Sequence, residues 1–168
     1  EMWDNFKYFL DRVLPVCEEA NVKIALHPND PPVACLKGIS NLITSAADYK
    51  HAFELAGNSP YLGMKMCIGC WLEGGDAFGN VLEEYFVEQK KVLIVHFRNV
   101  SGTVPYFEET LLEDGYMDMY KVMKQFVSCD YDGMMHVDHV PIYAESCGGE
   151  DSSGVYESIA QLCDYRSK

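Results

Sequence analysis

The stretch Val92-Leu93-Ile94-Val95-His96-Phe97-Arg98-Asn99-Val100 indicates the fold of this 168-residue chain. Its first half is a short apolar run rich in β-branched residues, which is typical of a buried strand in a parallel sheet. The run ends in His96, Arg98 and Asn99, whose side chains are costly to bury without partners. Because α/β folds carry their chemistry at the carboxyl ends of the strands, this stretch predicts a strand that leads into a site.

Three other apolar runs end in a similar way, and segments with helical spacing lie between them. The other strands are expected within residues 22–26, 61–67 and 134–137. Helices are expected over residues 3–20, 45–57, 80–89, 117–127 and 155–164, with Asp4 and Ser45 as N-caps and Asn21 as a stop. A Gly-rich loop to Gly79, an acidic loop over 101–118 and a Gly/Ser-rich segment over 146–154 are also expected. Strands that alternate with helices predict an α/β fold with a parallel sheet.

The composition is that of a globular domain with a strong negative charge. Apolar residues make up 48% of the chain, and 26 acidic against 13 basic residues give a net charge of −13. Nucleic acid and anionic membranes would be repelled by such a surface, because the basic residues do not cluster. We therefore expect neither as a partner, and the simplest explanation of the charge is solubility.

The seven cysteines indicate a reducing compartment. Their number is odd, and their spacing does not resemble a disulfide scaffold. The sequence has no signal peptide and no apolar run of membrane-span length. We expect a cytoplasmic protein in which most thiols are free. An amphipathic helix begins almost directly at Glu1, so we also expect a piece of a longer protein.

The four predicted strand ends carry His27, Cys67, His96 and Asp138. All four are residue types that bind divalent transition metals. Taken singly, each histidine could be a hydrogen-bonded loop residue and the cysteine could be core packing. Because neighbouring parallel strands would bring the four ends to one crevice, a shared metal site is the sharper hypothesis.

Two neighbouring residues leave alternatives open. Cys67-Ile68-Gly69-Cys70 is formally a CxxC motif, which could be a redox pair or half of a zinc site. Cys67 lies nearer the strand end, so we choose it over Cys70 as the ligand. His139 follows Asp138 and is free to act as an acid or base, although it could also be an ordinary loop histidine.

These segments resemble the mannonate dehydratases, a family of the xylose-isomerase-like TIM-barrel group. The matching segments are Met2-Trp3-Asp4-Asn5, residues 25–32, Met66-Cys67-Ile68-Gly69, residues 95–99, residues 114–120 and Asp138-His139-Val140-Pro141. The resemblance implies that residues 1–168 are a single partial domain, the C-terminal half of a (β/α)8 barrel whose N-terminal half is absent. A half-barrel has two open sheet edges, so poor folding, a homodimer or an inactive fragment are the outcomes left open.

The resemblance also implies roles for individual residues. The family's metal ligands map onto His27, Cys67, His96 and Asp138, the set that the strand ends suggest independently, and the metal would be Mn²⁺ or Fe²⁺. Catalytic roles map onto His139 and, with a one-residue insertion, onto Tyr156. The sequence departs from the family at Asn29, where Asp is usual. Ligand softness alone would suggest iron or zinc because of Cys67.

The implied activity is that of a hydro-lyase, which dehydrates D-mannonate to 2-keto-3-deoxy-D-gluconate in hexuronate (glucuronate) catabolism. Arg98 can hold the carboxylate of this small sugar acid bidentately, with Asn99 beside it, although Arg98 could instead form a structural ion pair. One alternative is a metal-dependent sugar isomerase or epimerase of the same fold. Another is a metal-binding fragment without catalytic activity.

Overall fold

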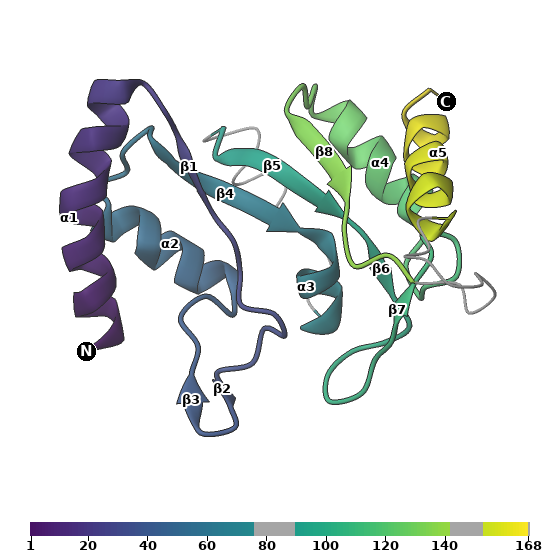
Figure 1. Cartoon of the computed structure of the whole chain (residues 1–168), viewed down its shortest axis with the longest axis horizontal. Coiled ribbons are helices and arrows are strands. Elements are labelled where there is room, and N and C mark those ends of the chain that lie inside the picture. The colour runs from purple at the N-terminus through teal and green to yellow at the C-terminus, as the bar shows by residue number, and fades with distance from the viewer. Residues whose placement is uncertain (76–89, 142–152, 168) are drawn as a thin grey trace.

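A four-stranded parallel sheet runs through the middle of the structure (Figure 1), a computed structural model that describes residues 1–75, 90–141 and 153–167. Its strands are β1 (Ile24–Leu26), β4 (Leu62–Cys67), β5 (Val92–Phe97) and β8 (Met134–Val137). They are hydrogen-bonded in the order β1-β4-β5-β8, and every pair is parallel. The predicted fold class, with parallel strands in sequence order, is therefore confirmed.

Five helices are described, and four of them match predicted segments. They are α1 (Met2–Ala20), α2 (Ala46–Leu55), α3 (Ile68–Glu73), α4 (Met119–Ser128) and α5 (Ser153–Ser167). In Figure 1, α1 and α2 lie on the β1 side of the sheet, whereas α4 and α5 lie on the β8 side. The helix expected over 80–89 lies outside the described residues. None of the described helices has the length and apolar character of a membrane span.

The helix ends follow local side-chain chemistry with one exception. Ser45 caps α2 as predicted, since its side chain accepts a hydrogen bond from the backbone N–H of Asp48. Asn21 ends α1 in the left-handed conformation with φ of 52°, which also agrees with the prediction. The prediction that Asp4 caps α1 is wrong, because the helix begins one turn earlier with Glu1 as the N-cap. Asp4 lies in the first turn, where its negative charge still interacts favourably with the helix dipole.

Two segments expected as loops contain regular structure. Residues 68–73 form α3, because Ile68, Trp71 and Leu72 share helical spacing and are buried in the core. The acidic segment 101–118 contains β7 (Glu109–Thr110), which pairs antiparallel with β6 (Asn99–Val100). A further hairpin joins β2 (Cys35–Leu36) to β3 (Ile39–Ser40).

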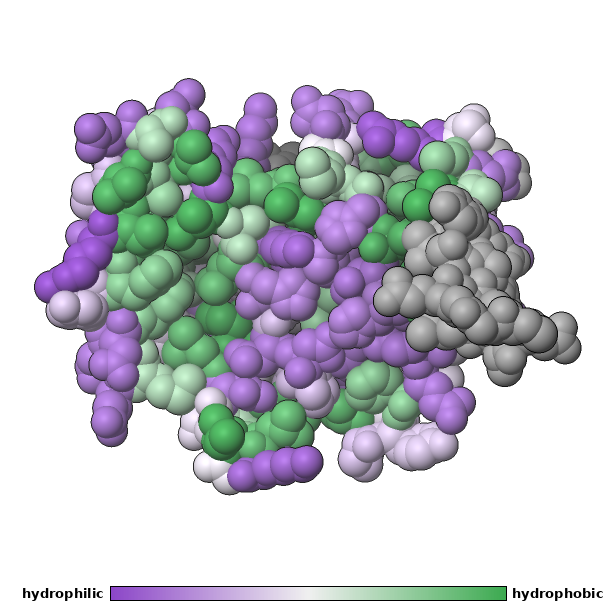
Figure 2. Space-filling model, in the orientation of Figure 1, coloured by the Kyte–Doolittle hydropathy of each residue, from purple (hydrophilic) through white to green (hydrophobic). Residues whose placement is uncertain are grey.

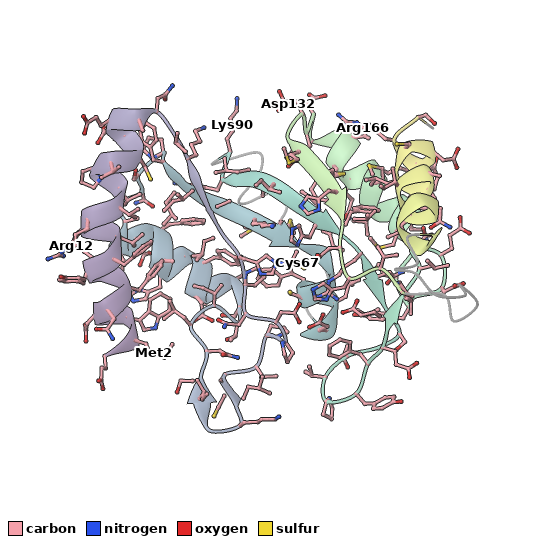
Figure 3. The ribbon with its side chains drawn as sticks, viewed as in Figure 1. Met2, Arg12, Cys67, Lys90, Asp132 and Arg166 are labelled. Carbon is pink, nitrogen blue, oxygen red and sulfur yellow. The ribbon has the colours of Figure 1, made fainter. Side chains whose placement is uncertain are left out.

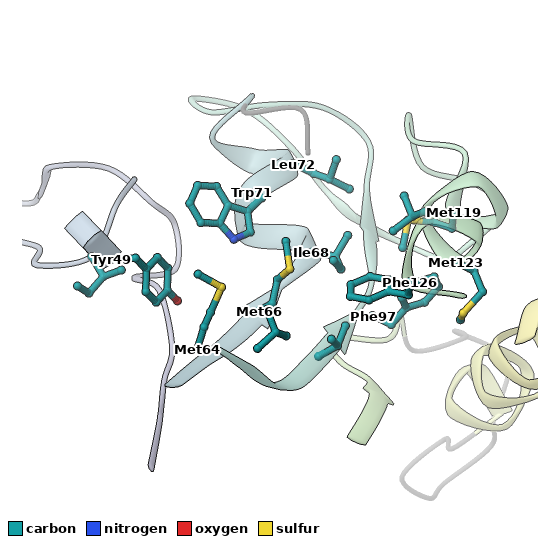
Figure 4. Packing of buried hydrophobic residues seen from close by; sticks show 14 of the residues in the cluster. Tyr49, Met64, Met66, Ile68, Trp71, Leu72, Phe97, Met119, Met123 and Phe126 are labelled. Carbon is teal, nitrogen blue, oxygen red and sulfur yellow. The ribbon is translucent and has the colours of Figure 1, made fainter. Parts of the chain in front are cut away.

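Alternation along β4 decides which of its side chains reach the site. Met64 and Met66 are buried in the core with Tyr49 and Trp71, as Figure 4 shows. Successive side chains of a strand point to opposite faces, so Cys67 emerges on the face opposite to Met66. The packed core therefore fixes the direction of Cys67.

Candidate metal centre

Three of the predicted ligands come together at the carboxyl ends of neighbouring strands. Ligand atoms of His27, Cys67 and His96 all lie within 4.8 Å of one another. Cys67 and His96 are register partners on β4 and β5, and His27 directly follows β1. Figure 3 places Cys67 near the centre of the molecule, at the end of β4. This separation of ligand atoms allows all three to reach one metal ion.

Asp138 joins this group through His96. It directly follows β8, and its Oδ2 lies 2.9 Å from His96 Nδ1. The three-residue set of mutually close ligand atoms does not include it. His136, the register partner of His96 on β8, packs its ring against that of His96 with the centroids 4.3 Å apart. The residues at the four strand ends thus lie close together, with Asp138 in contact with the group through His96.

The imidazoles of His27 and His96 can each offer a ring nitrogen to a metal. His96 is buried; its Nδ1 faces Asp138 Oδ2 at 2.9 Å, and its Nε2 has no hydrogen-bond partner among the described residues. Nδ1 of His27 lies 2.7 Å from the backbone oxygen of Pro28, to which it donates. In the neutral ring, that bond leaves a lone pair on Nε2 of His27, which is the form that binds metal. Unpartnered buried nitrogens are costly unless a ligand uses their lone pairs, so these residues fit a divalent transition metal.

The two thiols of the CxxC motif have opposite character. A hydrogen bond from Cys70, together with the imidazoles of His27 and His96, outweighs burial and lowers the pKa of Cys67 well below its usual range. The same contact with Cys67, together with burial, raises the pKa of Cys70. The thiolate is the form that binds metal. The geometry therefore favours Cys67 over Cys70 as the ligand.

Arg98 is surrounded by carboxylates of the chain itself. Its Nη1 lies 2.8 Å from both side-chain oxygens of Glu109, and its Nη2 lies 2.9 Å from Asp30 Oδ2 and 2.5 Å from Glu73 Oε1. The guanidinium is 2% exposed. These contacts form the structural ion pair that the sequence leaves open as the alternative to substrate binding, and they occupy both terminal nitrogens.

A second set of close ligand atoms already contains a cation. Ligand atoms of Asp30, Cys70 and Glu73 lie within 4.8 Å of one another, and Nη2 of Arg98 contacts all three residues. The guanidinium thus takes the place that a metal would need. Glu73 is fully buried, and this burial, although opposed by Arg98, raises the pKa of Glu73 to about 8.

Asn99 is committed to the backbone of the following segment. Its side-chain nitrogen donates to the carbonyl oxygens of Leu112 and Met117, at 2.9 and 2.8 Å, and its side-chain oxygen accepts from Val100 N. The residue is fully buried. These bonds tie β6 to the segment before α4, which is a structural role for Asn99.

His139 lies beside the ligand group and is partly exposed. Its Nδ1 is 2.9 Å from Glu109 Oε1, and its Nε2 is 3.7 Å from Asp138 Oδ2. Burial lowers the pKa of His139, but the hydrogen bond to Glu109 and the nearby carboxylates outweigh burial and raise it. The residue has a positive φ of 45°, which turns the chain sharply after Asp138.

Sequence reasoning missed the three carboxylates that hold Arg98. Asp30 follows the predicted ligand His27 by three residues, whereas Glu73 and Glu109 lie in segments expected as loops. A buried arginine requires acidic partners, and that requirement is the signal that could have prompted a search for them. The side chain of Tyr156 lies outside the described residues.

Asn29 stands where the family usually has Asp. Its side-chain oxygen accepts hydrogen bonds from the backbone N–H groups of Leu42 and Ile43 at 3.0 and 2.9 Å. An amide oxygen accepts such bonds as a carboxylate would. The substitution therefore keeps the tie between the segment after β1 and the one before α2.

The chain is similar to mannonate dehydratases over nearly its whole length. It is 31% identical to one from Thermotoga neapolitana and 35% identical to one from Thermotoga maritima, over 96% of this chain and 49% of each relative. The crystal structure of mannonate dehydratase from Streptococcus suis superposes with a TM-score of 0.84 at 28% identity, over 98% of this chain and 48% of that one. The chain thus spans about half the length of the curated relatives it matches.

A more distant likeness concerns the fold alone. A xylose isomerase domain protein from Alicyclobacillus acidocaldarius superposes with a TM-score of 0.73 at 16% identity, over 99% of this chain and 60% of that one.

The family model of D-mannonate dehydratase (UxuA) matches residues 1–163. Because this match covers almost the entire chain, the protein belongs to the D-mannonate dehydratase family.

Proposed function

We propose that this chain forms the metal-binding half of an enzyme that dehydrates D-mannonate to 2-keto-3-deoxy-D-gluconate, in hexuronate (glucuronate) catabolism. The observation that carries the proposal is the convergence of His27, Cys67 and His96, with Asp138 beside them, in a chain of this family. The substrate class is a small sugar acid.

The four ligands would hold a divalent metal, Mn²⁺ or Fe²⁺. When bound, such a metal stabilises the negative charge that develops on the substrate's carboxylate as the proton next to it leaves. Two histidines, a thiolate and a carboxylate are donors that first-row transition metals accept. The buried Nε2 of His96, which has no hydrogen-bond partner among the described residues, supports a ligand at this position.

Dehydration needs a base for the C2 proton and an acid for the departing C3 hydroxyl. The proton leaves C2, the C3 hydroxyl leaves as water, and the resulting enol becomes the 2-keto product. His139 is our candidate for one of these proton transfers, because its ring lies beside the proposed metal ligands, with Nε2 3.7 Å from Asp138 Oδ2. Tyr156 is the candidate for the other, on the resemblance of its sequence segment alone.

Arg98 and Asn99 support the site from inside the protein in this proposal. Their side-chain nitrogens contact carboxylates and backbone oxygens of the chain itself. Arg98 Nε is buried and lies 3.7 Å from Asp138 Oδ2, without a hydrogen bond among the described residues. Such contacts favour shaping of the ligand group over direct capture of the substrate carboxylate.

Cytoplasmic location and a homodimer are further parts of the proposal. All six described cysteines are free, which suits a reducing compartment. Both edge strands of the sheet, β1 and β8, have one unpaired side among the described residues, and open edges favour pairing with another chain.

The test compares Asp138→Asn with His139→Asn. Metal content is measured on the chain by elemental analysis, and D-mannonate dehydration is measured with the chain alone and mixed with the N-terminal half of the Thermotoga maritima relative. We expect Asp138→Asn to lose metal, since an amide is a poorer ligand than a carboxylate. His139→Asn should keep metal and lose roughly 10²–10⁴-fold in turnover. Normal metal binding and normal turnover in His139→Asn would overturn its role.

Substrate choice separates the alternatives. Turnover of an aldose in place of D-mannonate would indicate an isomerase or epimerase of the same fold. Metal binding without turnover of either substrate, in the mixture as well, would indicate a metal-binding fragment.

A further inference from the structure

We propose that Glu109 is a positioning residue that fixes the tautomer and the orientation of the His139 ring. Glu109 stands on β7, 30 residues before His139, and the two side chains meet at 2.9 Å. This inference rests on the proposed function only in so far as His139 transfers a proton there. The hydrogen bond itself is a property of the chain and can be tested without turnover.

Arg98 holds the side chain of Glu109 in a fixed position. Both of its oxygens lie 2.8 Å from Arg98 Nη1. The guanidinium cannot move toward solvent, because it is 2% exposed and its other terminal nitrogen is bound by Glu73 and Asp30. A carboxylate that accepts from a guanidinium at both oxygens is a fixed hydrogen-bond acceptor.

The fixed acceptor favours a proton on Nδ1 of the neutral His139 ring. Nδ1 faces Glu109 Oε1 at 2.9 Å and Asp30 Oδ2 at 3.8 Å, so a proton on Nδ1 points at two negative groups. In the neutral ring Nε2 then carries the lone pair. That nitrogen lies on the Asp138 side, 3.7 Å from Oδ2. A carboxylate that orients a histidine in this way recurs in catalytic and metal sites.

The pairing of β7 with β6 brings the Glu109 carboxylate next to His139. β7 runs antiparallel to β6, and Glu109 is the register partner of Val100, two residues beyond Arg98. His139 is 46% exposed and would rotate freely without a partner on Nδ1. The β6–β7 pair thus provides a rigid support for a side chain at the end of β8.

The direct test is the tautomer of His139, measured by ¹⁵N NMR. The metal-free, ¹⁵N-labelled chain is studied at a pH at which the ring is neutral, and the His139 signals are assigned with His139→Asn. We expect the wild-type ring to carry its proton on Nδ1. Glu109→Gln should move the signals toward the Nε2-protonated form. Glu108→Gln is the matched control, since this exposed neighbour contacts only Tyr106 through its side chain among the interactions described.

Two results would overturn the inference. One is a wild-type His139 that carries its proton on Nε2, and this result needs no variant to fold. The other is a Glu109→Gln protein with native circular dichroism and an unchanged His139 tautomer. Either result stands whether or not the chain takes part in dehydration.

Turnover gives a second readout in the mixture described above. Glu109→Gln should lower kcat by roughly 10–100-fold with little change in KM, as expected when a positioning partner is lost. In the His139→Asn background, Glu109→Gln should lower kcat little further, because Glu109 acts through the imidazole ring that this background lacks. Additive losses would refute a role through His139. No turnover in any variant, with the Nδ1 tautomer intact, would count against the proposed function and not against the pairing of these two side chains.

Discussion

Replacement of Glu73 by Gln should make the protein more stable at alkaline pH. Glu73 is fully buried, and its Oε1 accepts from Arg98 while its Oε2 has no hydrogen-bond partner among the described residues. Burial raises the pKa of Glu73 from 4.5 to about 8, so the folded protein holds a proton there that the unfolded chain releases. Gln has the shape of the protonated carboxyl and keeps an oxygen that accepts from Arg98.

The sign and size of the effect follow from proton linkage. Between pH 4.5 and about 8 the folded state binds more protons at Glu73 than the unfolded state, so wild-type stability falls as pH rises through this window. The Gln variant lacks this loss. At about 1.4 kcal/mol for each pKa unit, the upper bound on the difference is about 5 kcal/mol. Relaxation of the protein around a buried charge reduces this free-energy difference. We expect the stability of Glu73→Gln relative to wild type to grow by about 2 kcal/mol across the window.

The assay is urea unfolding followed by circular dichroism and by the fluorescence of the buried Trp71, at pH values from 5 to 9. Glu54→Gln, on the exposed side of α2, serves as the control. The stability of Glu73→Gln relative to wild type should rise with pH up to about 8 and then stay constant, whereas Glu54→Gln should follow wild type. Parallel curves for Glu73→Gln and wild type would refute the reasoning, since Glu73 would then be ionised in the folded protein.

Two further substitutions test the packing and the ligands of the site. Gly69→Ala should destabilise the fold by about 3 kcal/mol in thermal or urea unfolding, because a Cβ there would overlap the guanidinium carbon of the immobile Arg98; a loss below about 0.5 kcal/mol would show that Arg98 can move. Cys67→Ser should weaken binding of Mn²⁺ or Zn²⁺ by at least 10-fold in titration calorimetry, whereas Cys70→Ser should not, because the thiolate is at Cys67. Equal losses would mean that both thiols bind the metal.

One face of the molecule has a hydrophilic centre and a hydrophobic side (Figure 2). Figure 2 shows hydrophilic residues gathered in the middle of the viewed face, with hydrophobic residues toward the side where α1 lies in Figure 1. Phe9 and Val16, seven residues apart on α1, are 51% and 60% exposed. The polar centre coincides with the region around the end of β4, where Figure 3 labels Cys67.

The sequence by itself determined the parallel sheet and which polar side chains stand at the ends of its strands. A strand of β-branched residues followed by a polar side chain is a local pattern, and parallel strands necessarily bring their carboxyl ends to one edge. That reasoning found β5 and the group of His27, Cys67 and His96 without knowledge of any distance. Ser45 as a helix cap was found for the same reason, since a cap depends on neighbours only three residues away.

Only the tertiary structure decided which partners Arg98 and His139 have. Asp30, Glu73 and Glu109 come from three separate segments, and nothing in the periodicity of the sequence says that they surround one guanidinium. Charges pair according to distance in space and to burial, and both arise only when β7 folds back on β6 and α3 packs into the core. The closeness of His27, Cys67 and His96 could therefore be predicted from the strand pattern, whereas the ion network around Arg98 could not.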